Sequence, residues 1–302
     1  MSISTIGGIM RKEQLGKTYI HEHLYVDLSH IKKDNDAKLD DIEDVVEEIN
    51  ELKKSGISSI VEVTNRGMGR NIEVLTKIWE ETGINIIPSA GYYKEPFFPD
   101  EVYNLDYREI AKIITDEIQS GIDDTGVKAH VIGEVGTSKE NITETELKVL
   151  RAAAYAHLET GHPLFTHTTL GTMALEQLNL FQDYKVDISK VLIGHVDLNC
   201  DYDYHLRIAD RGCYLGFDTI GKLKYEKDEV RIAHIKNLID RGHIDQIVIA
   251  QDMTRKSHLK KNGGIGYNYI SETFIPMAIS HGITQGQIDH ILIENPKRLL
   301  DI

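Results

Sequence analysis

Six side chains that can bind metal ions follow short apolar segments spread along this sequence. His21 and His23 flank Glu22 in the run His-Glu-His-Leu, and alternate residues of a strand point to the same side of a sheet. The other four are Glu134, His167, His195 and Asp252. Imidazole and carboxylate ligands together suit zinc, manganese, iron, cobalt or nickel. Six ligands exceed what one tetrahedral zinc with an open position needs, so the set predicts two divalent ions that share a bridging carboxylate.

The apolar segments alternate with amphipathic stretches in a regular β-then-α order. The predicted strands span 18–23, 57–64, 84–90, 130–135, 164–167, 191–195, 214–218 and 247–252. Helical spacing covers 41–54, 71–82, 144–160, 173–184, 228–241 and 269–281. A glycine follows several of these helices, as at Gly83 and Gly161, where a helix C-cap is expected. Strict alternation implies a parallel sheet with right-handed crossovers, and eight such units predict a (β/α)8 TIM barrel.

The six candidate ligands all lie at the ends of five predicted strands. In a TIM barrel the carboxyl ends of the strands and the loops that follow them build the active site. An open doubly wound sheet is the alternative architecture, but His-Glu-His-Leu follows the first strand where a glycine-rich phosphate loop would stand. No linker interrupts the chain, so residues 1–302 are predicted to form a single domain.

Composition excludes several classes of protein. The 302 residues carry 34 basic and 48 acidic side chains, a net charge of −14 that argues against nucleic acid and anionic membranes as general partners. Two cysteines, Cys200 and Cys213, fit a reducing compartment, and no apolar run approaches the length of a membrane span. We therefore expect a cytoplasmic protein. The acidic stretch 34–51 has amphipathic-helix spacing, which predicts a solvated negative face.

The loop after the eighth predicted strand has the opposite charge. Residues 255–261 contain four Lys or Arg side chains and no acid, and Arg255 lies three residues beyond Asp252. A guanidinium there could bind a phosphate or carboxylate through two hydrogen bonds, or it could pair with the acidic surface. Lys222 is a weaker candidate of the same kind, and Asp218 is predicted to orient a histidine ligand. The remaining ten histidines are interpreted as structural.

At this point the sequence resembles the phosphotriesterase family of the amidohydrolase superfamily, and within it most of all the bacterial phosphotriesterase homology proteins. The resemblance spans nearly the whole chain. Its motifs are His21-Glu22-His23-Leu24, Gly133-Glu134-Val135-Gly136-Thr137-Ser138, Thr166-His167-Thr168, Gly194-His195-Val196-Asp197, Phe217-Asp218-Thr219-Ile220-Gly221, Asp252-Met253-Thr254-Arg255, Ser257-His258-Leu259-Lys260, Asn262-Gly263-Gly264, Gly266-Tyr267 and Glu294-Asn295-Pro296.

The resemblance implies a ligand assignment. One ion would be held by His21, His23 and Asp252, the second by His167 and His195, and Glu134 would bridge them. Phosphotriesterases and related lactonases carry a carboxylated lysine at the bridging position, whereas this chain has Glu134, as the homology proteins do. Related phosphosugar lactonases use a basic residue after the aspartate and a tyrosine from the third strand. Substrate contacts are therefore expected from Arg255, Tyr92, Tyr93 and Lys94.

These features predict a hydrolase with a pair of divalent metal ions, zinc being the first choice and manganese, cobalt, nickel or iron the alternatives. Two ions can share a water, lower its pKa and polarise the substrate, while Asp252 accepts the proton. The expected substrate is a small anionic ester, phosphoester or lactone, and the protein can form a homodimer. A metal-binding barrel with a regulatory or binding role is the first alternative. A metal-dependent isomerase or aldolase is the second, with Tyr92 or Tyr93 as its base.

Overall fold

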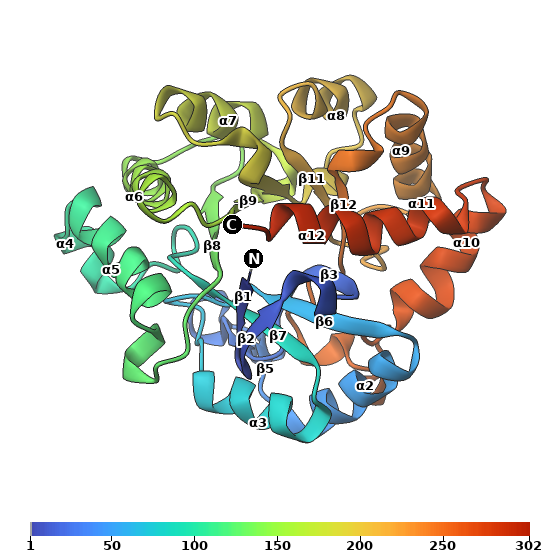
Figure 1. Cartoon of the computed structure of the whole chain (residues 1–302), viewed down its shortest axis with the longest axis horizontal. Helices are drawn as coiled ribbons and strands as arrows, with labels where there is room; N and C mark the ends of the chain where they lie inside the picture. Colours follow the sequence, from blue (N-terminus) through green and yellow to red (C-terminus); the bar gives the residue numbers. More distant parts are fainter. Residues whose placement is uncertain (1) are drawn as a thin grey trace.

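The computed structural model describes residues 2–302 and shows eight parallel strands in a nearly closed barrel surrounded by helices (Figure 1). The barrel strands are β3 (Lys17–Glu22), β6 (Ile57–Glu62), β7 (Asn85–Ala90), β8 (Val131–Thr137), β9 (Leu164–Thr168), β10 (Val191–Gly194), β11 (Tyr214–Phe217) and β12 (Ile247–Ile249). They follow one another around the barrel in chain order, with each neighbouring pair parallel. All eight predicted strands are present, and the predicted TIM barrel is confirmed.

Helices cover the outside of the barrel and connect its strands. They are α2 (Ile42–Lys54), α3 (Ile72–Thr82), α4 (Asp100–Asn104), α5 (Tyr107–Gln119), α6 (Glu144–Thr160), α7 (Ala174–Asp183), α8 (Tyr202–Ala209), α9 (Asp228–Asp240), α10 (Ile275–Ser280), α11 (Gln285–Asp289) and α12 (Asn295–Leu299). Gly83 and Gly161 end α3 and α6 in the left-handed conformation, as the sequence predicts. No helix within residues 2–302 is long and apolar enough to cross a membrane.

The sheet closes between its first and last strands, which excludes the open-sheet alternative. The amide of Asp252 donates to the carbonyl of His21 over 3.3 Å. Glu22, on the opposite side of its strand from His21 and His23, accepts from the amides of Gln251 (2.6 Å) and Met253 (3.1 Å). The buried carboxylate of β3 thus accepts the hydrogen bonds of two backbone amides that follow β12.

The barrel strands bury both of their faces, which explains their nearly continuous apolar sequences. One cluster takes one side chain from each barrel strand and fills the interior. Its members on the strands are Ile20, Val61, Ile87, Val131, Phe165, Leu192, Tyr214 and Val248. The residues next to these, such as Ile60 and Ile86, join the second cluster, which contains the helices. The hairpin of β1 (Ser2–Thr5) and β2 (Gly8–Arg11) and the C-terminal Leu299 and Leu300 contribute to the interior cluster at the amino ends of the strands. The two termini lie close together there (Figure 1).

The acidic stretch 34–51 departs from its prediction. Only its second half is helical, because α2 begins at Ile42 with Asp41 as its N-cap. The first half forms the short helix η2 (Asn35–Ala37) and the strand β5 (Lys38–Leu39), which pairs with β4 (Val26–Asp27). Leu39 is fully buried in β5, so its apolar character reflects burial of an extended segment rather than a helix face.

Candidate metal centre

The histidines of the first barrel strand point into a buried polar cluster at the carboxyl end of the barrel. His21 and His23 are both 0% exposed. The Nε2 atoms of both rings have no hydrogen-bond partner within residues 2–302. Buried polar atoms are rarely left without partners, so two open imidazole nitrogens on one face of one strand indicate ligand positions.

Glu134 lies between these histidines and the two that come from later strands. Its Oε1 lies 3.6 Å from Nε2 of His23, and its Oε2 lies 3.5 Å from Nε2 of His21. The same Oε2 is 3.1 Å from Nδ1 of His167 and 3.6 Å from Nε2 of His195. The two carboxylate oxygens therefore face different histidines, as a bridging ligand would require.

The preceding Gly133 makes this position possible. Its φ of +129° lies in a region that other residues rarely adopt, and a Cβ there would lie 2.1 Å from the carbonyl oxygen of Phe165. Only glycine lets β8 run this close to β9 immediately before the carboxylate.

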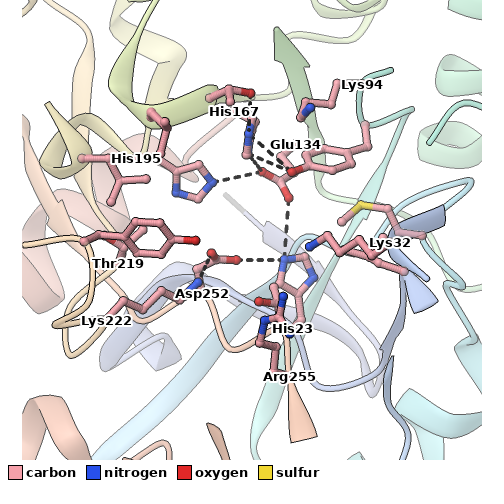
Figure 2. Close-up of a pocket in the computed structure, with 18 of the residues that line it drawn as sticks. His23, Lys32, Lys94, Glu134, His167, His195, Thr219, Lys222, Asp252 and Arg255 are labelled. Carbon is pink, nitrogen blue, oxygen red and sulfur yellow. Dashed lines mark hydrogen bonds and ion pairs between the residues drawn. The ribbon is translucent and has the colours of Figure 1, made fainter. Parts of the chain in front are cut away.

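Asp252 completes the cluster from the end of the last strand. Its Oδ1 lies 3.3 Å from Nε2 of His23 and 3.9 Å from Nε2 of His21. Three groups of side chains have donor atoms close enough to hold an ion. Two of them contain only the predicted ligands: His21, His23 and Asp252, and Glu134, His167 and His195; the third joins His21 and His195 to Asp218. The structure brings together all six residues that the sequence singles out, and Figure 2 shows five of them converging on one cavity.

A second layer of polar residues holds the histidine rings. Asp218 Oδ1 lies 2.7 Å from Nδ1 of His195, and its Oδ2 lies 3.1 Å from Nδ1 of His21. Because Nδ1 of each ring faces Asp218, Nε2 is left to face Glu134. The orienting role predicted for Asp218 agrees with these contacts. Its pKa is lowered despite burial, because two imidazoles face it.

His23 is held by a different pair of residues. Thr64 Oγ1 lies 2.7 Å from Nδ1 of His23 and donates to Glu62 over 2.6 Å. Burial raises the pKa of Glu62 to about 8. Glu62 and Thr64 are not among the predicted site residues, although both lie at the end of a predicted strand, as the ligands do.

The donor atoms of the cluster are of the types that bind divalent transition metals. The cluster offers nitrogen and oxygen donors, the Nε2 atoms of His21 and His23 are buried without hydrogen-bond partners, and the carboxylates face the histidines. Carboxylate oxygens lie 3.3 to 3.6 Å from imidazole nitrogens that face them, as at His23 and Asp252 or His21 and Glu134. Burial opposes a charge on His195, yet Asp218 raises the pKa of His195 to about 10. The arrangement thus favours positive charge at the place where metal ions would supply it.

A cavity of about 260 Å³ opens above this cluster. Its walls carry more positive than negative charge, because five Lys or Arg side chains line it while, within residues 2–302, its carboxylates are Glu134 and Asp252 alone. The cationic residues that line it are Lys32, Lys94, Lys222, Lys224 and Arg255. Leu170, Leu198 and Tyr225 form an apolar part of the wall.

The predicted substrate contacts fall in different places. Tyr93 and Lys94 line the cavity, and the Tyr93 hydroxyl lies 3.3 Å from Nδ1 of His167. Tyr92 does not line it: the side chain is fully buried and its hydroxyl donates to Glu101 over 2.6 Å. Of the two neighbouring tyrosines, only Tyr93 faces the site, because the Tyr92 hydroxyl is held by Glu101 instead.

Arg255 lines the cavity but is already paired. Its Nη1 lies 2.7 Å from Asp34 and 3.1 Å from Asp36. Other basic residues of the same loop also pair with the acidic stretch 34–51: Lys256 with Asp40, Lys260 with Glu51 and Lys261 with Asp44. The negative face of that stretch is therefore not simply solvated, and its carboxylates balance the charge of the basic loop.

Three basic residues that line the cavity, Lys32, Lys224 and His258, are not among the predicted substrate contacts, and Lys222 is predicted only as a weak candidate. Lys32 and His258 both line the cavity, although His258 was interpreted as structural. Lys222 forms an ion pair with Asp252. His258 belongs to the motif Ser257-His258-Leu259-Lys260, which could have drawn attention to it, whereas no motif marks Lys32.

Comparison with known proteins agrees with this geometry. The model of the phosphotriesterase family matches residues 1–300. The chain belongs to the phosphotriesterase family. Among curated members, the phosphotriesterase homology protein of Escherichia coli is 45% identical, covering 96% of this chain and 99% of that protein. The N-acetyltaurine hydrolase of Danio rerio is 34% identical, covering 99% and 97%.

Solved structures of phosphotriesterase-family proteins match the whole barrel. The crystal structure of the E. coli homology protein, complexed with phosphate in its active site, aligns with a TM-score of 0.93 at 45% identity, over 95% of this chain and 99% of that one. A lactonase from Listeria monocytogenes aligns with a TM-score of 0.94 at 31% identity, over 99% of both chains. The named activities of these relatives are hydrolytic, and we assign the chain to the metal-dependent hydrolases of this family.

Proposed function

We propose that the protein uses two divalent metal ions to hydrolyse a small anionic ester, phosphoester, lactone or amide. The observation that carries this proposal is the pair of ligand groups, joined at Glu134, directly beneath a cavity with cationic walls. His21, His23 and Asp252 would hold one ion, and His167 and His195 the other. Zinc is our first choice, because mixed imidazole and carboxylate ligands suit it, with manganese, cobalt, nickel and iron as alternatives.

The protein's own groups have separate tasks in this proposal. When bound, the metal ions would supply a more acidic water and a polarised substrate oxygen. Asp252 is the proposed proton acceptor, because it lies at the cavity wall beside the ligand histidines. Burial alone would favour its neutral form, but Lys222 and the histidines lower its pKa, so it stays in the ionised form that can accept a proton.

The cavity also limits the substrate. A volume of about 260 Å³ accommodates a small molecule rather than a polymer. Five Lys or Arg side chains line the walls, so an anionic group on the substrate is attracted rather than repelled. Arg255 keeps Nε and Nη2 for such a group while its Nη1 contacts Asp34 and Asp36, and we propose it as one contact. The amide class is included because a 34% identical relative is an N-acetyltaurine hydrolase.

Metal removal and restoration test this function. Purified protein is treated with a chelator, its metal content is measured by mass spectrometry, and zinc or manganese is added back. The assay uses anionic acetyl esters, phosphoesters, lactones and N-acetyl amides. We expect hydrolysis of at least one class to disappear with the metal and to return with about two ions per chain. Protein that holds two ions and hydrolyses none of these substrates would instead support a binding or regulatory role.

A further inference from the structure

The cations around the cavity differ in how far protein carboxylates already neutralise them. Lys222 pairs with Asp252, and Arg255 contacts Asp34 and Asp36. Lys224 has no carboxylate partner within residues 2–302, and its ammonium lies 4.8 Å from the centroid of the Tyr225 ring. Lys222 and Arg255 thus form a wall whose cations are paired. An anion that approaches this wall must compete with carboxylates already in place. Each interaction it gains there is offset by a weakened protein ion pair.

Lys32 and Lys94 form a wall whose positive charges are not paired with protein carboxylates. Within residues 2–302 the Lys32 ammonium forms no hydrogen bond or ion pair, and Lys94 donates only to the carbonyl oxygen of Glu95 over 3.0 Å. Both ammonium groups lie near the ring of Phe97, at 5.9 Å and 5.7 Å from its centroid. Two cations beside one aromatic ring, without a counter-ion, form a locally positive surface.

The backbone holds both lysines at the cavity. Lys32 is the last residue of α1 (Ser29–Lys32), which lies between the paired strands β4 and β5. Asp27, at the end of β4, accepts from the Ser29 amide over 3.0 Å and so fixes the start of α1. Figure 2 shows Lys32 and Lys94 on the same side of the cavity, opposite Lys222.

Gly136 brings Lys94 close to the metal cluster. A Cβ at position 136 would lie 3.1 Å from Cβ of both Lys94 and His167. Because glycine has no side chain, the Lys94 side chain can pass close to β8 at this position. Loss of surrounding water lowers the pKa of Lys32 and of Lys94. An ammonium that has lost water without gaining a counter-ion interacts more strongly with an incoming anion.

We propose that Lys32 and Lys94 form the subsite that binds the anionic group of the substrate, an oxyanion such as a carboxylate, sulfonate or phosphate. The inference rests on the proposed hydrolase function, since it assigns one part of the same cavity. It places the anion on the side of Phe97 and leaves the apolar wall of Leu170, Leu198 and Tyr225 for the uncharged part of the substrate.

Equilibrium binding of inorganic phosphate to the zinc-loaded protein, measured by calorimetry, tests the subsite without catalysis. The variants are Lys32→Gln and Lys94→Gln, and Lys33→Gln is the matched control, because Lys33 is the next residue, carries the same charge and does not line the cavity. We expect the Kd for phosphate to rise about tenfold in Lys32→Gln and in Lys94→Gln, the effect of losing one charge-assisted hydrogen bond, and to stay unchanged in Lys33→Gln. Titrations with methanesulfonate and succinate show which oxyanion the subsite prefers.

An unchanged Kd in Lys32→Gln and Lys94→Gln would overturn the subsite, as would an equal loss of affinity in Lys33→Gln or an absence of phosphate binding by the unsubstituted protein.

A second experiment measures catalysis and compares 4-nitrophenyl acetate with the anionic 4-nitrophenyl succinate. We expect Lys32→Gln to lower kcat/KM about tenfold for the anionic ester only. If the unsubstituted protein hydrolyses neither ester nor any other substrate class, the hydrolase function fails, while the phosphate titration still decides the subsite.

Discussion

Strand β8 buries a polar side chain near each end of the barrel, and the two environments differ. At the carboxyl end, Glu134 faces four histidines, two of which have an open Nε2. At the amino end, His130 just before the strand is also 0% exposed, but its Nδ1 accepts from the Ser4 amide (3.2 Å) and its Nε2 contacts the Leu300 carbonyl oxygen at 2.8 Å.

Whether the ring nitrogens have hydrogen-bond partners distinguishes a structural histidine from a candidate ligand better than burial does, since the histidines at both ends are buried. A buried histidine whose two nitrogens are both bonded has no capacity left for a ligand, and it serves the packing of the chain ends. A buried histidine with an open nitrogen that faces a carboxylate has such capacity. The comparison therefore predicts that changes at the carboxyl end alter metal binding and catalysis, while changes at the amino end alter stability alone.

The largest expected effect comes from removing the bridging carboxylate. Glu134→Gln should lower kcat/KM about 1,000-fold or more and should reduce the bound metal to one ion per chain or less, because the neutral amide cannot bridge two cations. Hydrolysis rate and metal content by mass spectrometry are the measurements. Glu140→Gln, which changes the same residue type on the surface outside the cavity, should behave like the unsubstituted protein. Full metal content in Glu134→Gln would break the comparison.

Asp218→Asn tests the layer behind the ligands. The amide keeps the shape of the side chain but loses the charge that faces His195 and His21, so metal affinity should fall about 10- to 100-fold. Competition with a chromogenic chelator measures this. Asp240→Asn, on the exposed end of α9, serves as the control. Equal affinity in both variants would show that the carboxylate does not tune the histidines.

The opposite end of the barrel should respond to pH. Burial lowers the pKa of His130 to about 4, well below the roughly 6.5 of an exposed histidine. The unfolded chain therefore takes up a proton near pH 6.5 that the folded chain accepts only near pH 4, so stability falls as the pH drops through this window. Between pH 7.5 and 5 the loss attributable to His130 should be about 2 kcal/mol.

Urea unfolding at these two pH values measures the effect. His130→Asn should be less stable than the unsubstituted protein at pH 7.5, should lose about 2 kcal/mol less on acidification, and should keep its metal content. The exposed His281→Asn should retain the original pH dependence. A fall in metal content in His130→Asn, with the fold intact, would contradict the separation of the two ends.

The smallest effect is expected at Arg255. Because Asp34 and Asp36 already contact its guanidinium, Arg255→Gln should raise KM for an anionic substrate only about threefold, less than Lys32→Gln. Lys256→Gln in the same loop, whose side chain pairs with Asp40 and does not line the cavity, is the matched control. A 100-fold rise in Arg255→Gln would move the anion to the other wall of the cavity.

Much of the carboxyl end could be predicted from the sequence because its ligands lie on strands. A strand has a fixed direction and alternates its faces, so the spacing of His21 and His23 already places them on one side. Barrel closure then brings the ends of distant strands together, which is why the positions of Glu134 and Asp252 could also be inferred. Orientation on a loop is harder to predict, and of the neighbouring Tyr92 and Tyr93 only the second reaches the cavity.

The sequence by itself determined the barrel, the set of candidate ligands and the excess of negative charge, because periodicity and residue type are local properties. Only the tertiary structure decided which charges remain available. The basic loop after β12 and the acidic stretch 34–51 lie more than 200 residues apart, and their pairing leaves Lys32, which belongs to no motif, as an unpaired cation at the cavity. Ion pairs depend on distances in space, and a sequence does not contain those distances until the chain is folded.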